Sequence, residues 1–224
     1  TLSDSQKSLL IMNFSDKEVF DTLKHMGKGK SPGPDGFSPE FYLSSWSVVG
    51  RDVVSAILFF FSNLHMPRFV NSTAISLVPK FPGASKVTDF RPISCCNTLY
   101  KCISKMLTSR LKRIIPSIIS DNQCAFVPKR NIGDNIMLAQ ALCRGYHRDA
   151  GPPRCVFKLD IQKAFDNISW SFLFNAMERF GFPLLFINWV QICVTSSMSS
   201  LKFNGGIEGF FKNRVGLRHG DPLS

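Results

Sequence analysis

The chain has 224 residues, of which 44% are hydrophobic and 19% are charged, and its formal net charge is +11. This composition is typical of a folded globular protein and excludes an intrinsically disordered one. The longest apolar run, Ala56 to Phe61, is far shorter than the roughly 20 residues that a membrane-spanning helix needs. We therefore expect no membrane partner.

The seven cysteines form no C-x-x-C pair, which indicates reduced thiols and an intracellular protein, nuclear or cytoplasmic. The first residue is Thr1 rather than Met, and the last residues lie inside a motif, so we expect a fragment of a longer protein.

The positive charge is concentrated in the middle of the chain. Residues 101–150 carry 9 basic and 3 acidic side chains, a balance of +6, against +2 for residues 1–100 and +3 for residues 151–224. A basic surface indicates a polyanionic partner such as nucleic acid. The candidate contacts are Lys101, Lys105, Lys112, Arg113, Lys129 and Arg130. An ordinary solvated helix face would give the same count, so this alternative stays open.

The first part of the chain predicts helices joined by a rigid loop. The sequence Ser15-Asp16-Lys17-Glu18 is typical of a capping box, and it opens a helix that ends at Gly27. Residues 28–37 are rich in glycine and proline, with lysines at the start, which predicts a rigid irregular loop. A long apolar helix is predicted for residues 49–65.

A strand from Thr73 to Lys80 is predicted next, followed by a turn that leads to Arg91. One cation on each arm of such a turn can clamp a triphosphate. A helix then begins near Asn97. Its predicted apolar face consists of Leu99, Ile103, Leu107 and Leu111.

The predicted site lies around the stretch from Cys155 to Trp170. Its first residues are apolar and predict a buried strand that ends at Asp160, and a helix follows Asp166. A carboxylate at the end of a strand suits a hard divalent cation such as Mg²⁺, as in phosphoryl or nucleotidyl transfer. The alternative is that Asp160 caps the next turn.

Other elements complete the prediction. A helix is expected for residues 133–147, and its inward face is predicted to hold Ile136, Met137, Gln140, Cys143 and Tyr146. A second helix is expected for residues 183–197, followed by a hairpin that turns at Asn204-Gly205-Gly206. At the end, Asp221-Pro222 predicts a helix start, with Asp221 as the N-cap.

Four ordered motifs now carry a resemblance. These are Ser31-Pro-Gly-Pro-Asp-Gly-Phe37, Phe90-Arg-Pro-Ile-Ser94, Phe157-Lys-Leu-Asp-Ile-Gln-Lys-Ala-Phe-Asp166 and Gly216-Leu-Arg-His-Gly-Asp-Pro-Leu-Ser224. Together they resemble the reverse transcriptases of non-LTR (LINE-type) retrotransposons, with a spacing most similar to plant elements. The resemblance implies an α+β fold with fingers in residues 1–150 and part of a palm in residues 151–224. It also implies an antiparallel palm sheet backed by helices.

The resemblance further implies an RNA-directed DNA polymerase that uses an RNA template, a DNA primer, dNTPs and Mg²⁺, with Mn²⁺ as the other metal. By this likeness Asp160 and the backbone carbonyl of Ile161 contact metal, and Phe165 crowds the sugar 2′ position. The nucleotide-binding positions are Lys80, Arg91, Phe165, His219 and Gly220.

Three departures from the family pattern matter. His219 replaces the usual Gln, and Lys129 replaces the usual Gly of a Gln-x-x-Phe-x-x-Gly-Arg pattern. The paired-aspartate hairpin that should follow the last motif is absent, so we expect these residues alone to be inactive, because two-metal transfer needs carboxylates on both sides of the metals. The other interpretations are a decayed remnant with a nucleic-acid-binding surface and a dicarboxylate nuclease.

Overall fold

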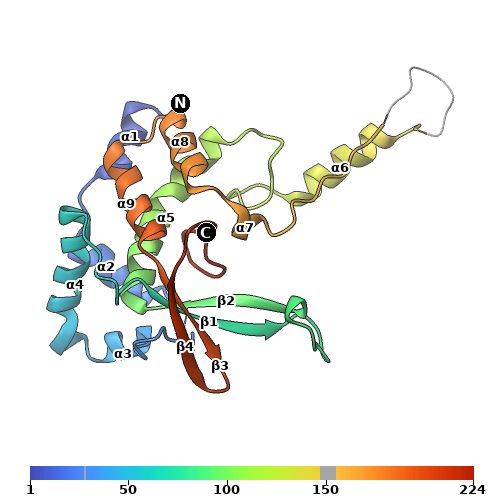
Figure 1. The fold of residues 1–224 in the computed structure, drawn as a ribbon. Helices are drawn as coiled ribbons and strands as arrows, with labels where there is room; N and C mark the ends of the chain where they lie inside the picture. The colour runs from blue at the N-terminus through green and yellow to red at the C-terminus, as the bar shows by residue number, and fades with distance from the viewer. Residues whose placement is uncertain (28, 147–154) are drawn as a thin grey trace.

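A computed structural model of the chain describes residues 1–27, 29–146 and 155–224. Figure 1 shows a helical body, a sheet that extends from one side of it, and helix α6, which projects away from both. The helices are α1 (Asp4–Ile11), α2 (Asp16–Lys24), α3 (Pro39–Ser44), α4 (Trp46–Asn63), α5 (Thr98–Ile118), α6 (Ile132–Cys143), α7 (Ala164–Asn167), α8 (Trp170–Phe180) and α9 (Leu184–Thr195), with a 3₁₀ turn at Val87–Asp89. The strands are β1 (Ser72–Pro79), β2 (Phe90–Cys96), β3 (Met198–Phe203) and β4 (Gly206–Lys212).

The hydrophobic core lies between the helices of the body, where α5 contacts α1, α2 and α4. Ile103 and Leu107 of α5 are buried, and Leu99 and Leu111 pack against the core, which confirms the predicted apolar face. The capping box at Ser15 is also present, because its hydroxyl accepts the Glu18 N–H while the Glu18 side chain accepts the Ser15 N–H. Local sequence signals therefore define the helical body well.

The sheet has the strand order β2-β1-β3-β4. β1 pairs antiparallel with β2 but parallel with β3, so the sheet is mixed. The prediction of a purely antiparallel sheet is therefore wrong. A long connection makes the parallel pair possible, because a parallel crossover needs a dozen or more residues. The β3–β4 hairpin turns at Asn204 and Gly205, whose φ values of 46° and 83° confirm the predicted tight turn.

The glycine- and proline-rich loop is anchored to the N-terminus of α5. The Asn97 side chain accepts the Asp35 N–H at 3.2 Å, and the Thr98 hydroxyl donates to the Phe37 carbonyl at 2.7 Å. A Cβ at Gly33 would lie 2.1 Å from Asn97 Oδ1, so only glycine allows this approach. The predicted rigidity of the loop thus has a specific cause, which is its contact with α5.

Two apolar segments are exposed where burial was predicted. Residues 155–161 form no strand, and Phe157 and Leu159 are 80% and 89% exposed. Helix α6 buries none of its residues, so its predicted inward face is also wrong. An apolar run is buried only where another element covers it, and no described element covers these two segments.

Among residues 1–27, 29–146 and 155–224, no helix is long and apolar enough to cross a membrane. All seven cysteines are free thiols.

The connection from α5 to α6 contains a strained backbone position at Lys129, whose φ is +66°. The next residue, Arg130, donates from Nη2 to the Pro116 and Ile119 carbonyls at 3.0 and 2.8 Å. Arg130 therefore satisfies carbonyls at the C-terminal end of α5 and fixes the turn that forces Lys129 into the left-handed region.

Lys129→Gly is expected to stabilise the chain by about 0.5–1 kcal/mol, because glycine adopts positive φ without a Cβ clash. Urea denaturation measures the change. Lys86→Gly is the control, since Lys86 is exposed and has a φ of −94°. An equal gain at both positions would contradict the explanation.

Candidate functional site

The candidate site forms where the segment around α7 docks on the segment that ends at Ser224. The Leu217 N–H donates to the Phe165 carbonyl at 2.8 Å, and the Gly216 N–H donates to the Ile168 carbonyl at 2.9 Å. The Trp170 indole N–H adds a bond of 2.8 Å to the Gly216 carbonyl. Residues about 50 positions apart are thus fixed against each other by main-chain contacts.

This docking brings together three of the residues predicted to bind the nucleotide. The rings of Phe165 and His219 lie with centroids 5.0 Å apart, and Gly220 follows directly with a φ of +92°. The His219 carbonyl accepts the Ser94 N–H at 2.9 Å, which ties the group to β2. Asp166 Oδ1 lies 3.5 Å from His219 Nε2. A cavity of about 210 Å³ opens beside this cluster.

Lys80 and Arg91 lie on the two arms of the β1–β2 hairpin, as predicted. Arg91 pairs with Val78 across the strands, and the Lys80 N–H donates to the Asp89 carbonyl at 2.8 Å. The Lys80 ammonium also donates to the Thr88 carbonyl at 2.7 Å. The Arg91 side chain is exposed and makes no hydrogen bond or ion pair with any residue that the structure describes. Lys80 and Arg91 are therefore near each other along the hairpin, and the Arg91 guanidinium is available to an anion.

Asp160 and Ile161 lie in the exposed segment 155–161, which belongs to no helix or strand. A carboxylate and a carbonyl are suitable oxygen donors for Mg²⁺. In the described part of the chain, however, no group of three or more His, Cys, Asp or Glu side chains could hold a metal ion. These residues therefore supply one side-chain ligand and do not themselves fit a two-metal centre.

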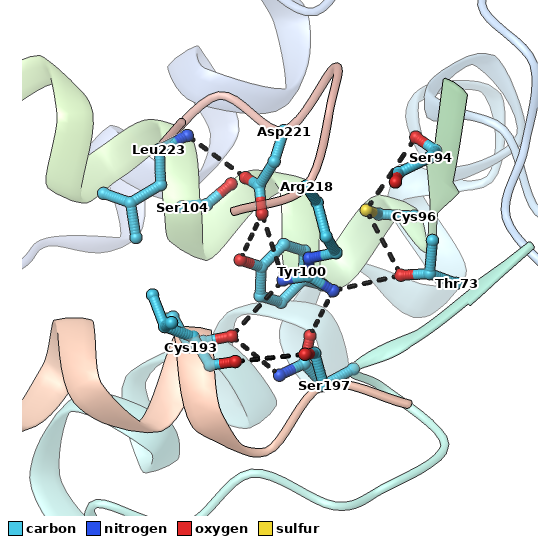
Figure 2. A network of polar contacts seen from close by, with 12 residues as sticks. Thr73, Ser94, Cys96, Tyr100, Ser104, Cys193, Ser197, Arg218, Asp221 and Leu223 are labelled. Atoms are coloured by element: carbon cyan, nitrogen blue, oxygen red, sulfur yellow. Dashed lines mark hydrogen bonds and ion pairs between the residues drawn. The ribbon is translucent and has the colours of Figure 1, made fainter. Parts of the chain in front are cut away.

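His219 and Gly220 lie between the two residues of a buried ion pair that the sequence did not reveal (Figure 2). Arg218 Nη2 lies 3.0 Å from Asp221 Oδ2, and the two side chains are only 8% and 4% exposed. The Tyr100 hydroxyl donates to the same carboxylate at 2.5 Å, and the Arg218 guanidinium lies 4.1 Å from the Tyr100 ring centroid. Arg218 Nη1 also donates to Asn71 Oδ1 at 2.7 Å and to Thr73 Oγ1 at 3.0 Å.

The charge states of this network follow from its burial. Burial raises the pKa of Tyr100 well above 10, so the phenol keeps its proton and donates to Asp221. Burial alone would lower the pKa of Arg218, but the surrounding acidic groups hold that pKa above its usual value. Arg218 is therefore a permanent cation that Asp221 compensates.

Asp221 makes the hydrogen bond of an N-cap side chain, but no helix follows it in the described residues. Its Oδ1 accepts the Leu223 N–H at 3.1 Å, as an N-cap side chain does, while residues 222 and 223 form a turn. Its other oxygen binds Arg218 and Tyr100. The ion pair could have been predicted from the Arg-x-x-Asp spacing. The contact with Tyr100 could not, because Tyr100 lies far away in the sequence.

The predicted nucleic-acid contacts differ in their availability. Lys112, Arg113 and Lys129 are exposed, whereas the ammonium groups of Lys101 and Lys105 each donate to one backbone carbonyl. Arg130 is occupied by carbonyls of the α5 end and by Asp121, so its guanidinium acts within the fold. The basic surface is therefore smaller than charge counting indicated.

Comparison with known proteins assigns the class. A family model described as reverse transcriptase (RNA-dependent DNA polymerase) matches residues 78–224, so the chain belongs to the reverse transcriptase family. Its α+β fold, with a mixed sheet backed by helices, agrees with a fingers and palm portion of such a domain.

The relatives come from mobile elements. The chain is 28% identical over 223 residues to the "Transposon TX1 uncharacterized 149 kDa protein" of Xenopus laevis, covering 100% of the chain and 17% of that protein. It is 29% identical over 200 residues to the Pol polyprotein from the type-2 retrotransposable element R2DM of Drosophila melanogaster, covering 87% of the chain and 18% of the relative. It is 23% identical over 197 residues to the Pol polyprotein from the type-1 retrotransposable element R2 of Nasonia vitripennis, with coverages of 88% and 18%.

The chain thus spans less than a fifth of the length of these relatives. They support the predicted retrotransposon lineage. They are animal proteins, so they give no support to the plant origin expected from the motif spacing.

Proposed function

We propose that this chain is part of the RNA-directed DNA polymerase of a non-LTR retrotransposon. Residues 1–150 form the fingers and their junction with the palm, and residues 151–224 form part of the palm. The parent protein copies an RNA template onto a DNA primer, using dNTPs, in the nucleus or cytoplasm. The family match over residues 78–224 is the observation that carries this proposal.

The positions of the nominated side chains support specific roles. Lys80 and Arg91 bind the phosphates of the incoming nucleotide, because they present two neighbouring cations on one hairpin. Phe165 borders the sugar, and its contact with His219 holds both rings beside Gly220. Asp160 and the Ile161 carbonyl are the candidate oxygen contacts for Mg²⁺ or Mn²⁺.

The proposal is tested by template-dependent DNA synthesis with the parent protein on an RNA template and a DNA primer. The Asp160→Asn protein supplies the background. Synthesis that persists at the wild-type rate in this variant would remove Asp160 from the site. A parent protein that binds the primer–template but never extends it would support the decayed remnant instead.

Arg91→Ala in the parent protein is expected to raise the apparent KM for all four dNTPs about tenfold, with kcat within about twofold. Each charge-assisted hydrogen bond to a phosphate contributes roughly 1.5 kcal/mol or more, and this contact acts on every nucleotide alike. Steady-state kinetics measure the change. Arg68→Ala is the control, because Arg68 is also exposed but lies before β1. A lowered melting temperature with unchanged KM would indicate a structural role for Arg91.

A further inference from the structure

Tyr100 of α5 holds both ends of a short segment of the candidate site (Figure 2). Its hydroxyl donates to Asp221 Oδ2 at 2.5 Å, and its ring centroid lies 4.1 Å from the guanidinium carbon of Arg218. Arg218 and Asp221 also bind each other at 3.0 Å. His219 and Gly220 are the two residues between them. We name residues 218–221 the clamped segment.

The middle of the clamped segment is fixed to β2, the strand that ends just before α5 begins. The His219 carbonyl accepts the Ser94 N–H at 2.9 Å. Tyr100 at the two ends and Ser94 in the middle thus determine where the His219 backbone lies. The His219 ring contacts the Phe165 ring, with centroids 5.0 Å apart. The position of that contact therefore depends on how firmly the clamped segment is held.

The bond from Tyr100 to Asp221 is strong because both groups are buried. Tyr100 has an exposed fraction of 0%, and that of the Asp221 side chain is 4%. Burial raises the pKa of Tyr100 well above its usual value, so the phenol keeps its proton. A hydroxyl that donates to a carboxylate makes a short, charge-assisted bond, stronger than one between neutral groups. Removing the hydroxyl alone would weaken the hold on Asp221 and keep the ring beside Arg218.

Tyr100 can act on a bound nucleotide only through the residues that it holds. It belongs to the wall of the cavity of about 210 Å³, yet solvent does not reach it. His219 and Asp166 line the same cavity, and their side chains are 36% and 47% exposed. A nucleotide that enters the cavity therefore meets His219 rather than Tyr100.

We propose that Tyr100 is a positioning residue for sugar selection. Its hydroxyl holds the clamped segment so that His219 keeps the Phe165 ring beside the sugar of the incoming nucleotide. This inference rests on the proposed function and adds to it a residue of α5 that does not touch the substrate. A ring excludes a 2′-hydroxyl by steric overlap, so the exclusion weakens when the ring is free to move.

The first test measures amide hydrogen exchange in the 224-residue chain by NMR. Tyr100→Phe removes the hydroxyl and keeps the ring. Exchange is expected to become about tenfold faster at Ser94 and Leu217, because their N–H groups bond to the carbonyls of His219 and Phe165 and open when the clamped segment loosens.

Two controls separate this loosening from a general loss of stability. The Lys80 N–H bonds to the Asp89 carbonyl in the β1–β2 hairpin, and its exchange should not change in Tyr100→Phe. Tyr42→Phe removes the same hydroxyl from another buried tyrosine, which belongs to α3 and is not among the described residues that line the cavity. It should leave the Ser94 and Leu217 amides unchanged.

The second test measures nucleotide incorporation by the parent protein. Tyr100→Phe is expected to lower the ratio of deoxyribonucleotide to ribonucleotide incorporation, each as kcat/KM, about three- to tenfold. The kcat for deoxyribonucleotides should stay within about twofold, because no group that contacts the substrate is removed. In a Phe165→Ala background Tyr100→Phe should change the ratio no further, because the ring that it positions is gone.

The outcomes distinguish positioning from packing. A lower melting temperature with an unchanged ratio and unchanged exchange at Ser94 and Leu217 would show that Tyr100 only stabilises the fold. A further loss of discrimination in the Phe165→Ala background would overturn the route through Phe165. Asp221→Asn weakens the same bond from its acceptor and replaces Tyr100→Phe if that variant does not fold. A parent protein that makes no DNA contradicts the proposed function, and hydrogen exchange then decides whether Tyr100 holds the clamped segment.

Discussion

Arg218→Met is expected to lower the free energy of unfolding by about 3–5 kcal/mol, because it leaves the Asp221 carboxylate buried without its cation. The substitution also removes the donors to Asn71 and Thr73 and the cation over the Tyr100 ring. For a chain of this size the melting temperature should fall by roughly 6–20 °C. Thermal unfolding followed by circular dichroism measures the change.

Arg214→Met is the matched control, since Arg214 lies four residues earlier and is exposed, and it should stay within about 0.5 kcal/mol of the wild type. Arg218→Met/Asp221→Asn should cost less than the sum of the two single changes, because the double variant no longer buries an unpaired charge. Strict additivity would mean that the ion pair contributes little and that the loss comes from packing.

The sequence correctly predicted the elements that are specified by residues close together in the chain. The capping box at Ser15, the apolar face of α5 and the Asn204-Gly205 turn are each specified by neighbouring residues, and all three are present. The site required contacts between distant segments. Phe165 contacts His219 only because main-chain hydrogen bonds join two segments about 50 residues apart. A pattern of apolar residues along the sequence does not predict such a contact.

Two kinds of error have a physical explanation. The apolar run from Cys155 to Leu159 predicted burial, but apolarity specifies only that a residue gains from being covered, not that a covering element is present. Charge counting treated all cations alike, whereas Arg110, Arg130 and Arg218 donate to backbone carbonyls inside the fold. The planar guanidinium suits such sites because its several donors have a fixed geometry. The parallel pairing of β1 with β3 also depends on tertiary contacts that no local pattern encodes.

Gly216→Ala is expected to destabilise the chain by about 2–5 kcal/mol, from two effects at one position. The φ of Gly216 is +78°, which costs an alanine about 1–2 kcal/mol. Its Cβ would also lie 2.7 Å from the Asp166 carbonyl oxygen and 2.8 Å from that of Phe165. Both neighbours are backbone atoms, and the Phe165 carbonyl is held by the Leu217 N–H, so relieving the overlap costs a further 1–3 kcal/mol or so.

Gly36→Ala separates these two effects, because Gly36 has a similar φ of +76° but nothing lies within 4 Å of an added Cβ. It should therefore lose only the conformational part, about 1–2 kcal/mol. Urea denaturation of both variants gives the difference. In the parent protein Gly216→Ala should also weaken dNTP binding, since the displaced backbone carries Phe165 away from His219, whereas Gly36→Ala should not. Equal stability losses in the two variants would show that the α7 segment moves freely and that Gly216 does not fix the site.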